Sequence, residues 1–570
     1  MAIIDLLTKI PEKDVKHRYV LDIFHKETYK GDDYIIVNER ILTKDNKILP
    51  NLRIYKNPKR TFYITKPPYR NHNYKKELED IKRLDTYICP SNELIIRLKE
   101  ALNVYSKNIR LSQLTKNPYV YGADIDIHSL IKMSYFSKIE NKQPYTPNIA
   151  TMDIEGHTLT KEIILLSYTF NWTTYLLIND EYFYEWKKSK DGKETKIKLD
   201  IKDVEILNKQ VYEETLNSLN KKARDLVLAN KPKFKFILCK NEEHLINTYF
   251  KIVRETVPDF ICLWNMTYDI QEIARAIKER LNKDPKDYFS HHKLPSALKT
   301  FKFKEDKVKR DHYALKWHYV EAPNTHTYID LYNLYVWNRR LQPKQSDYKL
   351  GTVLNDEIGV GKAFEIDNHS IWQRYHMLKY SVYNIYDSFN LYIMEQLNKD
   401  ILYLTIVCSL IPIKKFSHTT IKLRNLYYYF YKKKGKIISS ADMDSLKEFE
   451  KLLKNAGGAV LRPEKSLEAG ECILKENKLL KTFLHFFVND LDFSSIYPTV
   501  VRVFNISNTT HLLTPYKIKG FKTNDIYEYF SCLNGLNENS VYLCNKYFNL
   551  PNYDEIFDKF NSFIKGEINV

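Results

Sequence analysis

The sequence predicts a mixed α/β fold built on a buried sheet, and three observations lead to that prediction. Residues 163–170 are almost continuously apolar, as expected of a strand that is buried on both faces. Residues 234–239 and 259–264 form two more strand-like runs. Between them, residues 241–255 place apolar side chains at helical spacing, and Asn241 is the expected N-cap. Strands that alternate with helices favour an α/β architecture.

The length of the chain predicts several domains. With 570 residues it is too long for one core, and length alone suggests about three to five domains. We expect an N-terminal α+β domain over residues 1–145, to which residues 399–455 return, and an α/β domain over residues 146–398. Within the second, residues 300–322 alternate charged and aromatic side chains, which suggests a long basic hairpin.

The charge balance favours a polyanionic partner. Lysine and arginine exceed aspartate and glutamate by 18, and a positive surface field most often serves nucleic acid binding. Lys, Ile, Asn and Tyr are all abundant, however, as AT-rich coding would also produce. The charge alone therefore does not distinguish a nucleic acid partner from a biased genome.

The cysteines and the apolar segments predict a soluble cytoplasmic protein with no membrane partner. The seven cysteines are scattered without a Cys-x-x-Cys pair or zinc-like spacing, which indicates a reducing compartment. The N-terminus carries Asp5 within a very short apolar run, unlike a signal peptide. The most apolar run, residues 401–413, is shorter than the roughly 20 residues that a membrane span requires.

A pair of acidic residues on one predicted strand gives the first indication of chemistry. In the segment 150–156, Asp153 and Glu155 are two residues apart, so an extended strand places both carboxylates on one face and Ile154 on the other. Two like charges this close raise each other's pKa unless a cation lies between them, and Mg²⁺ prefers carboxylate oxygen. Asp-x-Glu also arises by chance, and Asp124 and Asp126 have the same spacing.

Two further acidic residues follow in the chain. Asp269 lies where a strand passes into a helix, four residues after Asn265, and it could equally be a helix-capping residue. Residues 376–398 are predicted to be helical, which places Tyr383 and Asp387 at i and i+4 on one helix face. A tyrosine and a carboxylate in that relation are more often a simple surface contact.

Taken together and in this order, the motifs resemble the three exonuclease motifs of the DnaQ-like 3′–5′ exonucleases, whose fold is RNase H-like. Four carboxylates can hold two divalent ions about 4 Å apart, which stabilise the attacking and leaving oxygens of a phosphodiester. The resemblance implies two Mg²⁺ ions, with Mn²⁺ as the alternative. It also implies that Tyr383 positions the attacking water and that Asn265 and Tyr268 contact DNA. The metal-binding residues would be Asp153, Glu155, Asp269 and Asp387.

Residues 489–499, with the sequence Asn-Asp-Leu-Asp-Phe-Ser-Ser-Ile-Tyr-Pro-Thr, resemble motif A of the family B DNA polymerases. Residues 500–507 point to the T4-like phage branch of that family, and the resemblance spans about residues 121–507. It implies that Asp492 binds both catalytic Mg²⁺ ions and that Tyr497 packs under the sugar of the dNTP. Backbone N–H groups of Ser494, Ser495 and Ile496 would hold its triphosphate. Asp490 has the wrong offset to Ser495 and Tyr497 for the metal-binding role.

The chain departs from the family in two places. The Tyr-x-Gly-Gly element that contacts DNA matches residues 455–458, with Asn455 in place of tyrosine before Gly457 and Gly458. The fingers and palm motifs that carry the triphosphate-binding lysine and the second metal-binding aspartate are not found before Val570. We expect a partial palm over residues 456–548 and the start of the fingers over 549–570.

The resemblance therefore implies the N-terminal part of a split or truncated family B replicative DNA polymerase that carries a proofreading exonuclease. Its partners would be a DNA primer-template with its single-stranded 3′ end, a dNTP, a second polymerase chain with the missing motifs, and a sliding clamp. For a viral chain, the compartment would be the host cytoplasm. The alternatives are a stand-alone exonuclease with a vestigial palm and a non-catalytic DNA-binding assembly subunit.

Overall fold

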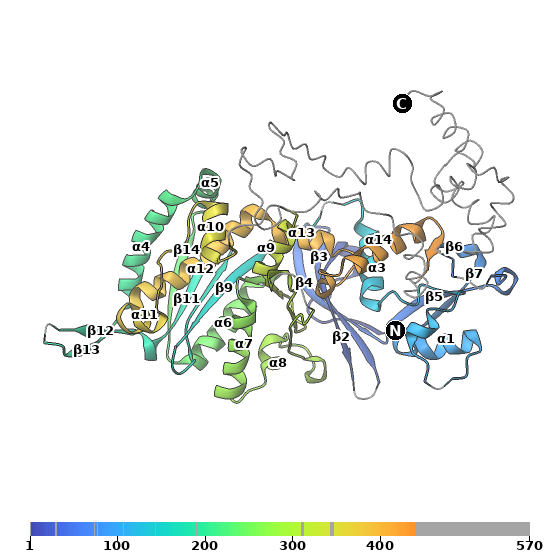
Figure 1. Ribbon diagram of the computed structural model, residues 1–570, viewed down its shortest axis with the longest axis horizontal. Coiled ribbons are helices and arrows are strands. Elements are labelled where there is room, and N and C mark those ends of the chain that lie inside the picture. Colours follow the sequence, from blue (N-terminus) through green and yellow to red (C-terminus); the bar gives the residue numbers. More distant parts are fainter. Residues whose placement is uncertain are drawn as a thin grey trace, which may run out of the picture. The chain divides into compact units, whose positions relative to one another are not determined.

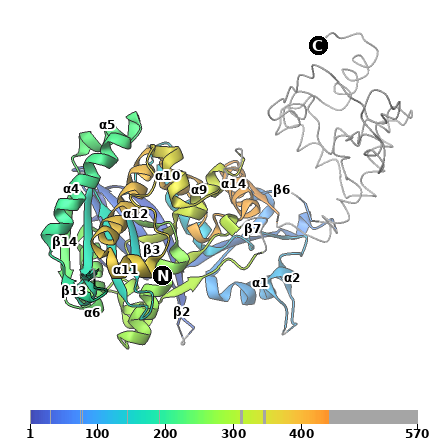
Figure 2. The same ribbon diagram turned by 60° about the vertical axis from the view of Figure 1, so that its left-hand side comes forward.

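The computed structural model describes residues 2–28, 31–72, 75–76, 78–106, 108–142, 144–189, 191–308, 313–341 and 347–439. Within these residues the protein is a mixed α/β structure with fourteen α-helices and several sheets, as the sequence predicts (Figures 1 and 2). The expected palm and fingers lie outside the described residues. So do seven predicted site residues: Gly457, Gly458, Asp492, Ser494, Ser495, Ile496 and Tyr497.

The chain divides into two compact units. The first comprises residues 1–64, 78–114 and 121–438, and the second comprises residues 65–77, 115–120 and 439–570. In the described part of the second unit, the Tyr119 hydroxyl donates a hydrogen bond to the His72 carbonyl (2.7 Å). Because the first unit holds residues on both sides of position 145, the domain boundary expected there stays a prediction.

A six-stranded sheet forms the centre of the first unit, with the order β14-β11-β10-β9-β15-β18. Strand β10 is antiparallel to β9 and β11, whereas β11 and β14, β9 and β15, and β15 and β18 are parallel pairs. The strands are β9 (Ile149–Gly156), β10 (Ile163–Phe170), β11 (Thr173–Asn179), β14 (Lys233–Cys239), β15 (Phe260–Leu263) and β18 (Thr327–Asp330). The three predicted strands are confirmed.

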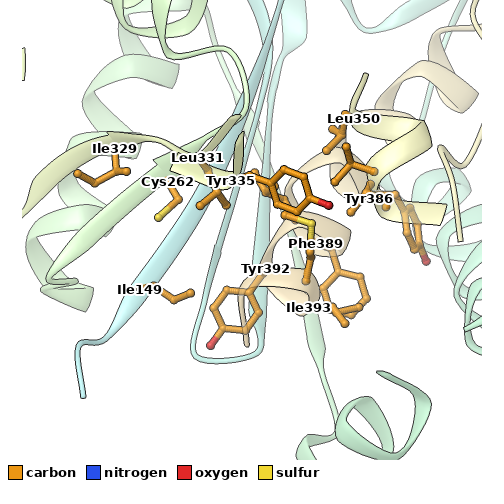
Figure 3. Close-up of a cluster of buried hydrophobic side chains, with 14 of the residues drawn as sticks. Ile149, Cys262, Ile329, Leu331, Tyr335, Leu350, Tyr386, Phe389, Tyr392 and Ile393 are labelled. Atoms are coloured by element: carbon orange, nitrogen blue, oxygen red, sulfur yellow. The ribbon is translucent and has the colours of Figure 1, made fainter. Parts of the chain in front are cut away.

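Helices pack against both faces of this sheet. On one face, Met152 and Ile154 of β9 lie in a buried cluster with side chains of α6 and α7. On the other, Ile149 and Cys262 of the sheet cluster with Phe389 of α12 (Figure 3). The helices of the two layers are α6 (Glu242–Thr256), α7 (Met266–Arg275), α12 (Met377–Asn398), α4 (Ile201–Ser218), α5 (Lys221–Asn230), α9 (Leu331–Arg339) and α10 (Leu350–Ile358).

Local signals set the ends of these helices where the sequence predicts them. The side chain of Asn241 accepts a hydrogen bond from the His244 N–H (2.9 Å) and caps α6. The predicted helix over 376–398 is α12. After α7 the chain makes one π-helical turn, Ala276–Arg280.

The N-terminal residues form a second, antiparallel sheet with the order β1-β4-β3-β2. Helix α3 (Ile127–Ile139) covers one face, where Ile131 and Tyr135 pack on Ile23 and Ile35. Its strands are β1 (Ala2–Asp5), β2 (Val15–Glu27), β3 (Asp33–Thr43) and β4 (Ile48–Lys56).

Residues after 399 return to the N-terminal segment. Strand β19 pairs with β6, and Tyr428 of α14 lies in a buried cluster with Tyr63 and Tyr121. The elements of this region are β5 (Lys59–Thr65), β6 (Leu78–Asp80), β7 (Leu84–Pro90), β8 (Val120–Tyr121), α1 (Leu94–Leu102), α2 (Leu111–Leu114), α13 (Asp400–Val407), α14 (Thr419–Lys433) and β19 (Lys436–Ile438). Among the described helices, none combines the length and the apolar character that crossing a membrane requires.

Two hairpins extend the α/β layer. Strands β16 (Lys302–Lys304) and β17 (Tyr319–Glu321) pair antiparallel, after the short helix α8 (Pro285–Phe289), so residues 300–322 contain the predicted hairpin. Its Trp317 and Tyr319 side chains are buried, and the Trp317 indole donates to the Ile413 carbonyl (3.0 Å). These two aromatic residues therefore pack the core. The other hairpin consists of β12 (Tyr184–Lys188) and β13 (Glu194–Lys198) and lies beside α11 (His369–Tyr375).

A buried ion pair joins the N-terminal sheet to the six-stranded sheet. Arg40 of β3 lies with its Nε 2.5 Å from the Asp259 carboxylate, and both side chains are buried. The Arg40 guanidinium also donates to the Thr325 carbonyl (2.7 Å). Asp259 accepts from the Tyr145 hydroxyl (2.7 Å) and the Asn148 N–H (2.6 Å). Removing one member of such a pair leaves the other charge buried without compensation.

We therefore expect Arg40→Met to lower the free energy of unfolding by about 3–5 kcal/mol, measured by urea denaturation followed by tryptophan fluorescence. Arg97→Met is the matched control, because Arg97 is exposed and its ion pairs with Glu93 and Glu100 lie within its own helical segment. It should leave the unfolding midpoint nearly unchanged. Equal shifts in the two variants would contradict the role of the buried pair.

Candidate metal centre

Strand β9 presents two carboxylates to α12. The Thr151 hydroxyl donates a hydrogen bond to the Ser388 carbonyl of α12 (2.7 Å), so this side of the strand faces that helix. Asp153 and Glu155 follow at alternate positions and share the same side. Ile154 points the other way, into the cluster with α6 and α7. The arrangement predicted from strand alternation is confirmed.

The third carboxylate comes from the middle of α12. One oxygen from each of Asp153, Glu155 and Asp387 can be chosen so that all three lie within 4.8 Å of one another. Asp387 is buried, and the other two are partly buried. Tyr383, one helical turn earlier, is also buried. The fold thus joins two segments that are far apart in the sequence into one acidic cluster.

Asp269 lies beside this cluster without belonging to the group of three. It is in the first turn of α7 and is 2% exposed. Asn265 accepts the capping hydrogen bond from the Tyr268 N–H (3.4 Å), so Asn265 is the capping residue. Within the described residues, Asp269 Oδ2 has no hydrogen-bond partner. The carboxylate is nevertheless close enough to raise the pKa of Asp153.

Asn265 and Tyr268, the predicted DNA contacts, are both exposed at the start of α7. The Tyr268 side chain is 45% exposed, and its hydroxyl lies 2.8 Å from the position that a Cβ atom on Gly156 would occupy. Glycine at the end of β9 therefore allows the Tyr268 ring to approach the strand that carries Asp153 and Glu155.

Three side chains that sequence reasoning missed contact the carboxylates, and a fourth contacts one of these three. The Asn384 amide donates to Asp153 (2.6 Å), and the Tyr380 hydroxyl donates to Glu155. The Lys362 ammonium lies 3.1 Å from Asp387 and also contacts the Tyr383 hydroxyl. His369 Nδ1 lies 2.8 Å from the Tyr380 hydroxyl. Residues 380, 383, 384 and 387 have the i, i+3, i+4, i+7 spacing of one helix face, and that signal could have identified Tyr380 and Asn384.

The pKa values of the cluster reflect burial and mutual repulsion. Burial raises the pKa of Asp153 well above its usual range, and the charges of Asp269 and Asp387 add to the effect. Burial also raises the pKa of Glu155 from 4.5 to about 8. For Asp387 burial again raises the pKa, while the Lys362 ammonium opposes the increase. Carboxylates in this arrangement ionise together only when a cation compensates them.

This set of side chains fits a hard divalent cation. The available ligands are all carboxylate oxygens, which Mg²⁺ and Ca²⁺ prefer over the nitrogen and sulfur that Zn²⁺ favours. Within the described residues, Asp387 Oδ1 and Asp269 Oδ2 have no hydrogen-bond partner. Buried oxygens of this kind normally have a partner, and a metal ion would supply one. Asp153, Glu155 and Asp387 can therefore hold a metal ion.

We expect the melting temperature in the presence of a chelator to fall as the pH rises from about 4.5 to 8. The raised pKa means that folded Glu155 keeps a proton that the unfolded chain has already lost, so stability is present at low pH and is lost as the pH rises through this range. Added Mg²⁺ should restore the melting temperature, most strongly above pH 8, because it binds the ionised folded form.

Glu155→Gln is the control for this measurement, since it removes the titrating group and keeps the side-chain volume. Its melting temperature should depend less on pH than that of the unmodified chain and should respond less to Mg²⁺. Identical pH profiles for the two proteins would contradict the assignment of the raised pKa to Glu155.

The comparisons with known proteins leave the function to be inferred from the site and the sequence motifs. No protein-family model matches the chain, and no curated protein matches it. Among the described residues, three carboxylates that can hold a metal ion, with a fourth beside them, form the candidate functional site.

Proposed function

We propose that this chain is a magnesium-dependent 3′–5′ exonuclease with an RNase H-like sheet. The observation that carries the proposal is the convergence of Asp153, Glu155 and Asp387 within 4.8 Å, with Asp269 beside them. These are the residues, in the same chain order, that the exonuclease motifs supply. The five strands β11-β10-β9-β15-β18, with β10 antiparallel to its neighbours, support the proposed sheet.

The chemistry assigned to the metal is that of a two-ion phosphodiesterase. Bound Mg²⁺ would polarise the phosphodiester and lower the pKa of a water molecule, as metal ions do in phosphoryl-transfer sites. Asp153, Glu155 and Asp387 would hold one ion, and Asp269 would contribute to a second.

The remaining side chains position these groups. The Tyr383 hydroxyl lies next to Lys362 and one turn from Asp387, where it can orient the attacking water. The Lys362 ammonium brings positive charge to the place where a phosphate would lie. Asn384 and Tyr380 fix the orientation of Asp153 and Glu155 through their hydrogen bonds. Hydrogen bonds behind metal ligands set ligand orientation and metal affinity.

The wider proposal is that the chain is the N-terminal part of a split or truncated family B replicative DNA polymerase. It rests on the motif A resemblance at residues 489–499, with Asp492 as metal ligand and Tyr497 under the sugar. A second chain with the missing motifs, a primer-template, a dNTP and a sliding clamp would be its partners. Asp492 alone does not complete a two-ion site, so we expect primer extension to need a chain that carries the second metal-binding aspartate.

The test of the exonuclease is degradation of a 5′-labelled single-stranded oligonucleotide in Mg²⁺. We expect stepwise shortening from the 3′ end. Asp153→Ala should reduce its rate at least about 100-fold, since mutating even a residue that hydrogen-bonds to a metal ligand lowers metal affinity or activity about 10–100-fold. Asp124→Ala is the matched control, because Asp124 belongs to an acidic pair of the same spacing outside the cluster. It should retain full activity.

The outcomes separate the alternatives. Absence of shortening would favour the non-catalytic assembly subunit. Shortening without any gain of primer extension when a chain carrying the missing motifs is added would favour the stand-alone exonuclease.

A second prediction separates the roles of two tyrosines on α12. Tyr383→Phe should lower kcat by about 100-fold with little change in Mg²⁺ affinity, because a misplaced nucleophile costs about that much. Tyr380→Phe should instead weaken Mg²⁺ binding about 10–100-fold, because it releases Glu155. Mg²⁺ titrations of activity and single-turnover rates give the two quantities.

Tyr386→Phe is the control, since its hydroxyl contacts the Asn208 carbonyl away from the carboxylates (3.4 Å). A fall in Mg²⁺ affinity for Tyr383→Phe equal to that for Tyr380→Phe would contradict the separate roles.

A further inference from the structure

The β12–β13 hairpin is a projecting element with a lysine-rich surface. Figure 1 shows the two paired strands extending beyond the helices at one end of the six-stranded sheet. Residues 184–198 contain six lysines and three acidic residues. Of the described lysines, Lys187, Lys188 and Lys193 are exposed near the turn. A solvated surface is the ordinary explanation of such a charge run. The placement of the acidic residues therefore decides whether the exposed surface of the hairpin has an excess of positive charge.

Two of the three acidic side chains face the protein. Glu185 accepts a hydrogen bond from the Leu378 N–H at the start of α12 (2.9 Å). Glu194 accepts from the Tyr375 hydroxyl (2.6 Å) and pairs with Arg374, both on α11. Their negative charge is thus used in anchoring the hairpin. The exposed residues of the hairpin, among them Lys187, Lys188 and Lys193, keep an excess of positive charge.

The helix that anchors the hairpin also contacts the carboxylate strand. The Gln373 amide of α11 donates to the Gly156 carbonyl (2.8 Å) and accepts from the Thr158 N–H (3.0 Å). His369, at the other end of α11, lies 3.8 Å from Glu155. A helix of seven residues is only about 10 Å long. Glu194, which pairs with Lys188 beside the turn of the hairpin, and the acidic cluster are therefore both contacted by one short helix.

We propose that the β12–β13 hairpin is a binding arm for the backbone of a single-stranded nucleic acid whose 3′ end lies at the carboxylates. This proposal rests on the proposed exonuclease function and adds to it the surface that holds the substrate upstream of the cleaved bond. Positive charge complements the phosphates, and each five-residue strand of the hairpin spans about 16 Å, at about 3.3 Å per residue. The arm binds without sequence preference, because its contacts are to phosphate.

The test compares two double charge reversals in the Asp153→Ala background, which prevents cleavage. The arm variant is Lys187→Glu with Lys193→Glu. The control is Lys221→Glu with Lys222→Glu, two exposed lysines on α5 that give the same change in net charge. Fluorescence anisotropy with a labelled single strand of about 16 nucleotides, a length within the range that single-strand binding folds cover, measures affinity at several salt concentrations.

We expect the arm variant to bind at least about tenfold more weakly at low salt, with the slope of log K against log salt reduced by about 1 to 1.5. The control pair should change affinity by less than about twofold. Equal losses in both variants would mean that only net charge matters and would overturn the proposal. An unchanged affinity in the arm variant would overturn it as well.

Cleavage assays without the Asp153→Ala substitution separate this proposal from the exonuclease assignment. With the arm variant, the loss of kcat/KM should be largest for the long strand and should shrink for a dinucleotide too short to reach the hairpin. A loss of kcat/KM that is independent of substrate length would overturn the proposal that the hairpin binds the substrate. Failure of the unmodified chain to cleave either substrate would overturn the exonuclease function, and the anisotropy result would then decide the arm alone.

Discussion

Repulsion among the carboxylates of Asp153, Glu155 and Asp387, which are buried or partly buried, is the constraint on which the candidate site depends. Burial raises the pKa of all three, and neighbouring carboxylates add to the effect at Asp153 and Glu155. Two rigid elements prevent their separation. Strand alternation fixes the first two on β9, and the packing of α12 across the sheet fixes the third.

Neighbouring side chains stabilise the carboxylates in two different ways. Asn384 and Tyr380 donate hydrogen bonds that restrict the rotamers of Asp153 and Glu155. Lys362 supplies a positive charge beside Asp387 and lowers the energy of its ionised form. A donor fixes the direction of a carboxylate oxygen, whereas a cation offsets its charge. The site therefore has defined ligand directions before any metal binds, which is what preorganised catalysis requires.

Much of this arrangement was predictable from periodicity alone. Alternation placed Asp153 and Glu155 on one face of a strand, and helical spacing placed Tyr383 and Asp387 on one face of a helix. Lys362 gave no such signal, because it lies in a loop and meets Asp387 only through tertiary contact. Trp317 belongs to the predicted basic hairpin, yet its side chain is buried and its indole donates to the Ile413 carbonyl. Periodicity within a short segment does not predict which side chains it meets from segments far away in the sequence.

The stability cost of the acidic cluster supports the proposed catalytic role over a purely structural one. A subunit that only held DNA or joined two chains would be more stable with an amide or an apolar side chain at any of these positions, since buried like charges oppose folding. Strained or repulsive arrangements of this kind persist mainly where chemistry uses them. The same chain places a lysine beside Asp387 and a tyrosine one turn away from it, groups that suit a phosphate and a water molecule. The acidic cluster, the hydrogen-bond donors that orient it and its cost in folding stability together support the proposed metal-dependent phosphodiester chemistry.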